Sequence, residues 1–100
     1  MDNFYIKPNQ LKILTEIFSK YCPNAEIWAY GSRVNGSAHE GSDLDLVIKS
    51  FNSDNCSISE LRQFIQNSDI PFLVDLNLFE SMPKSFQDEI LKRFLVIWGK

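Results

Sequence analysis

The sequence predicts an α+β fold in which helices pack around a three-stranded mixed sheet. Segments with apolar residues at helical spacing alternate with short apolar runs that are typical of buried strands. Polar loops separate these segments, and no repeat or low-complexity tract interrupts them. At 100 residues the chain is long enough for one real core, so we expect a single domain over residues 1–100.

A first helix is predicted between Pro8 and Pro23. A proline suits the first turn of a helix and cannot continue one, and apolar side chains recur between the two prolines at helical spacing. These side chains are Leu11, Leu14, Ile17, Phe18 and Tyr21.

Two short strands are predicted next, over residues 27–30 and 44–48. Each is an apolar run, and the first is closed by Gly31. The polar stretch FNSDNC then ends the second strand, and Ser57 with Glu60 forms the S-x-x-E pattern that starts a second helix.

A third strand and a final helix complete the prediction. The run FLVDLNLF follows Pro71, and strand alternation places its polar residues Asp75 and Asn77 on one face. After Pro83, apolar residues again recur three and four positions apart, which predicts a helix to the C-terminus. These residues are Phe86, Ile90, Leu91, Phe94 and Trp98.

Composition excludes several classes of protein. The chain is 44% apolar and 23% charged, which is ordinary for a globular domain, and its net charge of −3 argues against nucleic acid as the main partner. Cys22 and Cys56 lack the spacing of a zinc site or a disulfide framework. The sequence shows neither a signal peptide nor an apolar run of membrane-spanning length, so we expect a cytoplasmic protein without membrane contact.

Two aspartates at the start of the second strand indicate a functional site. Aspartate is a poor strand former, yet Asp43 and Asp45 open this strand. Residues two apart in a strand share a face, with α-carbons about 6.5–7 Å apart, so both carboxylates can converge on one point. Such oxygen ligands suit Mg²⁺, and a pair of ions in phosphoryl-type transfer.

The turn before these aspartates predicts a phosphate site. Gly31 and Ser32 let the backbone come close to a ligand, and the SRVNG segment can start a short helix whose N–H groups favour an anion. Ser32 can face Asp43 only if the first two strands are antiparallel. If the third strand lies beside the second, Asp75 adds a third carboxylate, as a base or a further metal ligand.

Together these residues resemble the nucleotidyltransferase superfamily typified by DNA polymerase beta. The pattern is Gly31 and Ser32, ten further residues, Asp43 and Asp45, and a later Asp75 in an apolar strand. The order of elements and the length are similar to those of minimal nucleotidyltransferases, which act as antitoxins to HEPN-domain toxins. The resemblance covers nearly the whole chain and implies a polymerase-beta-type core.

The resemblance also implies roles. Gly31, Ser32 and Arg33 would bind the triphosphate of ATP, although many members read GSRARG where this chain has Val34 and Asn35. The carboxylates would be catalytic and would hold Mg²⁺, as two ions; these are Asp43, Asp45 and Asp75. The antitoxin would then transfer AMP from ATP to a tyrosine of its cognate HEPN toxin.

Alternatives remain open from the sequence. The same fold could serve a non-catalytic antitoxin that covers its partner, and the acceptor hydroxyl could belong to a small molecule or an RNA end. Asp75 could instead be a structural carboxylate held by backbone donors or by Arg62. A P-loop is disfavoured, because GSRVNGS lacks the lysine that reaches the terminal phosphates.

Overall fold

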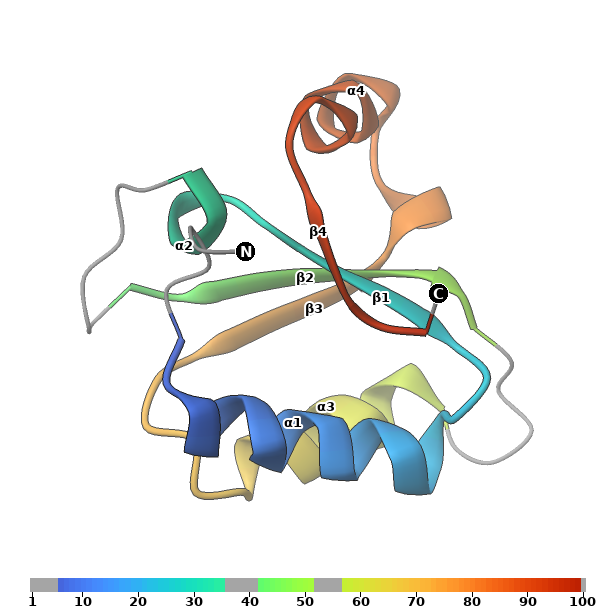
Figure 1. The fold of residues 1–100 in the computed structure, drawn as a ribbon. Coiled ribbons are helices and arrows are strands. Elements are labelled where there is room, and N and C mark those ends of the chain that lie inside the picture. Colours follow the sequence, from blue (N-terminus) through green and yellow to red (C-terminus); the bar gives the residue numbers. More distant parts are fainter. Residues whose placement is uncertain (1–5, 36–41, 52–56, 100) are drawn as a thin grey trace.

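The computed structural model describes residues 6–35, 42–51 and 57–99, and it has the predicted α+β architecture (Figure 1). The elements are α1 (Pro8–Tyr21), β1 (Glu26–Tyr30), α2 (Ser32–Asn35), β2 (Leu44–Ser50), α3 (Ile58–Gln66), β3 (Val74–Leu78), the 3₁₀ helix η1 (Phe79–Ser81), α4 (Lys84–Lys92) and β4 (Leu95–Trp98). The first two long helices begin where their sequence signals predict: Pro8 is the first residue of α1, and Ser57 with Glu60 forms the capping box of α3.

The sheet topology satisfies both geometric conditions that the sequence imposed. β1 runs antiparallel to β2, and β3 lies beside β2 in parallel. The register makes Asp45 the partner of Tyr30 on one side and of Asp75 on the other. The three segments that carry the predicted site therefore meet at one end of the sheet, where β1 ends and β2 and β3 begin.

The strand count and the final helix differ from the prediction. In the described residues the sheet has four strands, in the order β3-β2-β1-β4. The helix ends at Lys92, Arg93 is extended, and Leu95–Trp98 forms β4 along the free edge of β1. Phe94 and Trp98 fit a helical period, but the β-branched pair Val96 and Ile97 favours a strand, and β1 offers its unpaired edge.

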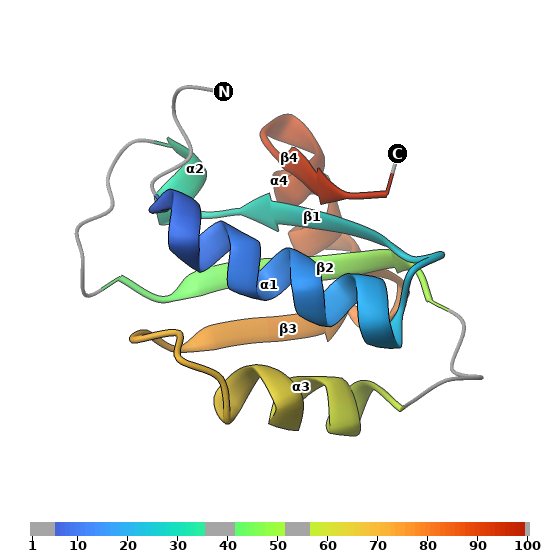
Figure 2. The ribbon, with the colours of Figure 1, turned by 60° about the horizontal axis from the view of Figure 1, so that its bottom comes forward.

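Each face of the sheet has its own core. The main cluster lies between the sheet and helices α1 and α3, which lie side by side over one face (Figure 2). Leu44, Leu46 and Ile48 point into it. A smaller cluster on the opposite face, under α4, contains Val47 and Trp28. Because side chains alternate along a strand, Asp43 and Asp45 share the α4 face with Val47.

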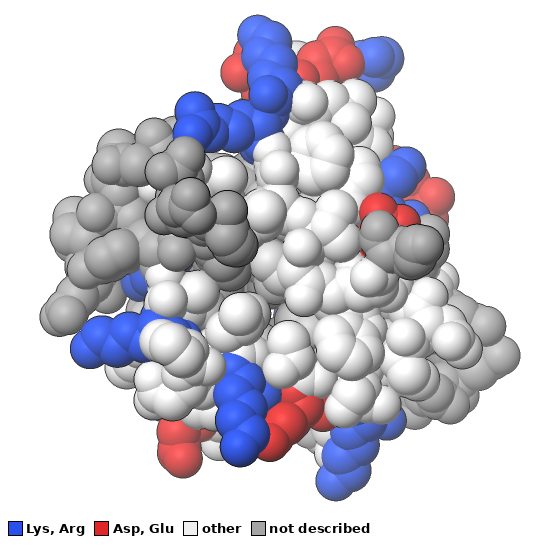
Figure 3. All heavy atoms as spheres, in the orientation of Figure 1, with Lys and Arg blue, Asp and Glu red and all other residues white. Residues whose placement is uncertain are grey.

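Figure 3 shows the charged side chains on one face of the molecule. There the described lysines and arginines lie around the rim, some next to one another and others beside acidic side chains, and they form no continuous basic stripe. Within the described residues, no helix is long and apolar enough to cross a membrane.

Candidate active site

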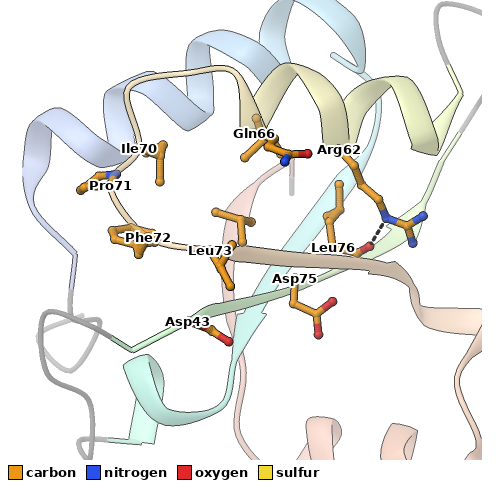
Figure 4. Close-up of a pocket in the computed structure, with 11 residues that line it drawn as sticks. Asp43, Arg62, Gln66, Ile70, Pro71, Phe72, Leu73, Asp75 and Leu76 are labelled. Atoms are coloured by element: carbon orange, nitrogen blue, oxygen red, sulfur yellow. Dashed lines mark hydrogen bonds between the residues drawn. The ribbon is translucent and has the colours of Figure 1, made fainter.

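The three predicted carboxylates lie on neighbouring strands and on one face of the sheet. Asp43 precedes β2, Asp45 lies within β2, and Asp75 is the register partner of Asp45 in β3. In Figure 4, Asp43 and Asp75 both lie on the side of β3 that faces away from α3. The structure thus brings together carboxylates separated by thirty residues in the chain.

The electrostatics show that these carboxylates interact. Burial raises the pKa of Asp45 above its usual range, and the charges of Asp75 and Asp43 raise it further. Burial, followed by the charges of Asp45 and Asp75, raises the pKa of Tyr30 to about 12. Both pKa shifts come first from burial and then from the negative charge of the neighbouring carboxylates. The Tyr30 phenol consequently stays protonated at physiological pH.

Two of the described lysines have acidic partners outside this cluster. On α4, Lys84 pairs with Asp88 and Lys92 pairs with Glu89. An all-oxygen set of carboxylates suits Mg²⁺, which prefers oxygen ligands and keeps several waters. The donor set fits the ion chemically, but the described side chains do not form a close group of three metal-binding residues in their present conformations.

Gly31 occupies its position for two reasons. Its φ of 83° lies in the left-handed region that side chains disfavour. A Cβ at this position would overlap Oδ2 of Asp45 and lie 3.3 Å from its carboxyl carbon. The turn between β1 and α2 therefore packs directly on the Asp45 carboxylate, and Ser32 begins α2 beside it. The predicted phosphate turn and the predicted metal site are adjacent.

Arg33 is buried, with 2% of its surface exposed. Its Nε and one Nη atom donate to the carbonyl oxygen of Ser42 at 3.0 and 2.7 Å, and its guanidinium lies 3.9 Å from the centre of the Phe72 ring. Arg33 thereby joins the turn after β1 to the residue before Asp43. These contacts hold the site together, and the predicted contact of Arg33 with phosphate stays a prediction.

Asp75 belongs to a row of hydrogen-bonded polar side chains, of which the sequence predicted only that Asp75 and Asn77 share a strand face. Asn77 Nδ2 donates to Asp75 Oδ1 at 3.1 Å, as their shared strand face allows. The alternative that Arg62 holds Asp75 directly is wrong. Arg62 donates instead to the carbonyl of Leu76 at 2.8 Å and to Asn77 Oδ1 at 3.2 Å.

Tyr30 lies at the site but was not predicted as a site residue. The antiparallel pairing of the first two strands, which makes Tyr30 the partner of Asp45, is the one feature of the sequence prediction that could have indicated it. His39, the one histidine of the chain, lies outside the described residues.

A groove of about 680 Å³ opens beside the carboxylates (Figure 4). Asp43 and Asp75 lie at one end of its lining, while Ile70, Phe72 and Leu73 of the α3–β3 connection supply apolar walls. Leu73 is 70% exposed. The groove offers space for a ligand next to the acidic cluster.

Comparison with known proteins agrees with this geometry. Residues 12–100 match the family described as "Polymerase beta, Nucleotidyltransferase", and the chain belongs to this family of nucleotidyltransferases. A Haemophilus influenzae protein named "Probable protein adenylyltransferase MntA" is 36% identical over 96 residues, which cover 95% of this chain and 84% of the relative. A solved structure described as "Crystal structure of the toxin-antitoxin with AMP-PNP" covers 90% of this chain and 73% of its own, with a TM-score of 0.71 and 23% identity, and shows the same fold.

Proposed function

We propose that this chain transfers AMP from ATP to a protein hydroxyl. The observation that carries the proposal is the group of Asp43, Asp45 and Asp75 beside the Gly31 turn, where burial and then the charges of Asp75 and Asp43 raise the pKa of Asp45. A triphosphate brings more negative charge to a site that is already negative, so a divalent cation has to come with it. Mg²⁺ held by the three carboxylates, as two ions, would neutralise charge at the α-phosphate.

The residues of the chain have separate tasks in this reaction. Gly31 and Ser32 hold the triphosphate, because the glycine leaves the backbone open to a close ligand. The acceptor oxygen forms a bond to the α-phosphorus while the bond from that phosphorus to the bridging oxygen breaks, and pyrophosphate leaves with the electron pair. Asp75 takes the hydroxyl proton through Oδ2, the oxygen that Asn77 does not hold. Arg33 fixes the turn from within, and also contacts phosphate if the turn opens.

The acceptor we infer is a tyrosine of a cognate HEPN-type toxin, which makes this chain an antitoxin of the cytoplasm, where ATP is abundant. Two findings support it: the resemblance to minimal nucleotidyltransferases, and the 36% identity to a relative named as a protein adenylyltransferase. The net charge of −3 gives less support to an RNA end.

Intact mass spectrometry of a co-expressed toxin tests the function. We expect the toxin to gain the mass of one or more adenylyl groups with the wild-type chain, ATP and Mg²⁺. The gain should disappear with EDTA and with Asp43→Asn, which keeps the shape of the side chain. A toxin that is neutralised and stays bound without a mass change would replace adenylyl transfer with the non-catalytic antitoxin.

The same reaction mixture, offered small-molecule and RNA acceptors, checks the acceptor class. Labelled AMP should appear on the toxin, and its appearance on RNA or on a small molecule instead would overturn the protein acceptor.

A further inference from the structure

We infer that Arg62 and Asn77 are positioning residues that orient Asp75 for the reaction, an inference that rests on the proposed role of Asp75. They form one continuous chain of hydrogen bonds. Arg62 Nη2 donates to Asn77 Oδ1 at 3.2 Å, and Asn77 Nδ2 donates to Asp75 Oδ1 at 3.1 Å. We call these three residues the Arg62 relay.

The relay has a fixed direction. A guanidinium only donates hydrogen bonds, so the oxygen of the Asn77 amide has to face Arg62 and its NH₂ group has to face Asp75. Asp75 therefore receives a donor on one oxygen and keeps the other for chemistry. Removing Arg62 would let the amide turn over and present its oxygen to the carboxylate.

Arg62 itself has a rigid anchor. Its Nε donates at 2.8 Å to the carbonyl oxygen of Leu76, which lies in β3 between the two polar residues of the relay (Figure 4). β3 is an edge strand, so the outer carbonyl groups on this edge lack a strand partner. Arg62 of α3 thus binds β3, the strand that carries Asp75, and also orients the Asn77 side chain on that strand.

Asp75 needs such support because packing does not provide it. Its side chain is exposed, and its neighbours across the sheet are carboxylates that repel it. In the described structure, Asn77 is the hydrogen-bond donor to this carboxylate. A carboxylate in this environment would otherwise rotate away from Asp45, towards solvent.

The test compares Asn77→Ala and Asn77→Thr with the wild-type chain. Both variants remove the amide, and threonine keeps a high strand propensity. We expect kcat for adenylyl transfer to fall on the order of 10-fold, the scale found for groups that orient metal-binding side chains, with KM for ATP within about twofold. We also expect Mn²⁺ alone, titrated without ATP, to bind on the order of 10-fold more weakly.

Arg62→Ala should lower kcat in the same direction. The double variant with Asn77→Ala should match Asn77→Ala alone in Mn²⁺ affinity and kcat, because the effect of Arg62 on the orientation of Asp75 passes through that amide. Asn67→Ala, an exposed asparagine at the end of α3, is the matched control and should change neither kcat nor Mn²⁺ affinity.

Wild-type kcat and Mn²⁺ affinity in both Asn77 variants would overturn the inference, as would additive effects of Arg62→Ala and Asn77→Ala. Absence of adenylyl transfer by the wild-type chain would overturn the proposed function instead. In that case the Mn²⁺ titration still decides whether the Arg62 relay orients Asp75.

Discussion

Asp45→Asn should stabilise the metal-free protein while it abolishes transfer. Asp45 and Asp75 are register partners on adjacent parallel strands, which lie about 4.8 Å apart, so we place their carboxylates about 6 Å from each other. Two unit charges at about 6 Å repel by about 0.7 kcal/mol in water and about 2.8 kcal/mol at an effective dielectric constant of about 20. Because Asp75 is exposed, solvent screens the pair, and we expect a gain of about 0.5–1 kcal/mol.

Thermal unfolding in EDTA at neutral pH and low salt measures this gain. For a domain of this size it corresponds to a rise in Tm of about 2–8 °C, which added salt should reduce. Asp88→Asn is the matched control, because Asp88 forms an exposed pair with Lys84 and its loss should leave Tm unchanged or slightly lower. A lower Tm for Asp45→Asn than for the wild type would refute the reasoning, since it would mean that structural donors satisfy this carboxylate.

The sign of the pH dependence gives a second check on the same variant. The pKa of Asp45 is raised in the folded protein, so the folded state binds more protons than the unfolded state between the two pKa values. The metal-free wild type should therefore lose stability as the pH rises from the ordinary aspartate pKa through the folded one. Asp45→Asn should lack this part of the slope, and an unchanged slope would contradict the pKa that burial and the neighbouring carboxylates raise.

Three further predictions follow from the same region. Gly31→Ala should cost about 1–3 kcal/mol of stability and abolish transfer, because an alanine is strained at a φ of 83° and its Cβ displaces Asp45. Gly99→Ala is the control: Gly99 has a φ of 87°, so this variant should lose stability in thermal melts but keep transfer. Ser32→Ala should raise KM for ATP more than it lowers kcat, since it removes a contact present before the chemical step, and unchanged ATP affinity with a large fall in kcat would contradict this. The pKa of Tyr30 rises from 10.0 to about 12 on folding, so the stability of the wild type should fall, relative to that of Tyr30→Phe, as the pH rises above 10. Unfolding experiments over this pH range measure the difference, and parallel curves of stability against pH for the two proteins would contradict the burial of this phenol among carboxylates.

Much of the site could be predicted because it depends on local rules. Alternation along a strand puts Asp43 and Asp45 on one face, and the antiparallel return is the one topology that lets Ser32 approach them. The fourth strand could not be predicted in this way. Phe94 and Trp98 recur at a helical interval, and only the unpaired edge of β1 makes Leu95–Trp98 a strand. A periodic pattern carries no information about which edges the rest of the chain leaves open.

The contacts of Arg33 and Arg62 also could not be predicted from local sequence patterns. Sequence alone places Arg33 after a turn and Arg62 on a helix, where both would ordinarily be solvated charges. In the folded chain Arg33 is buried and joins the phosphate turn to the entry of β2, while Arg62 binds the outer edge of β3 and orients Asn77. Each arginine donates to a backbone carbonyl, Arg33 to that of Ser42 and Arg62 to that of Leu76. These bonds link α2 to the residue before Asp43 and α3 to the strand that carries Asp75, so both arginines fix the backbone around the carboxylates.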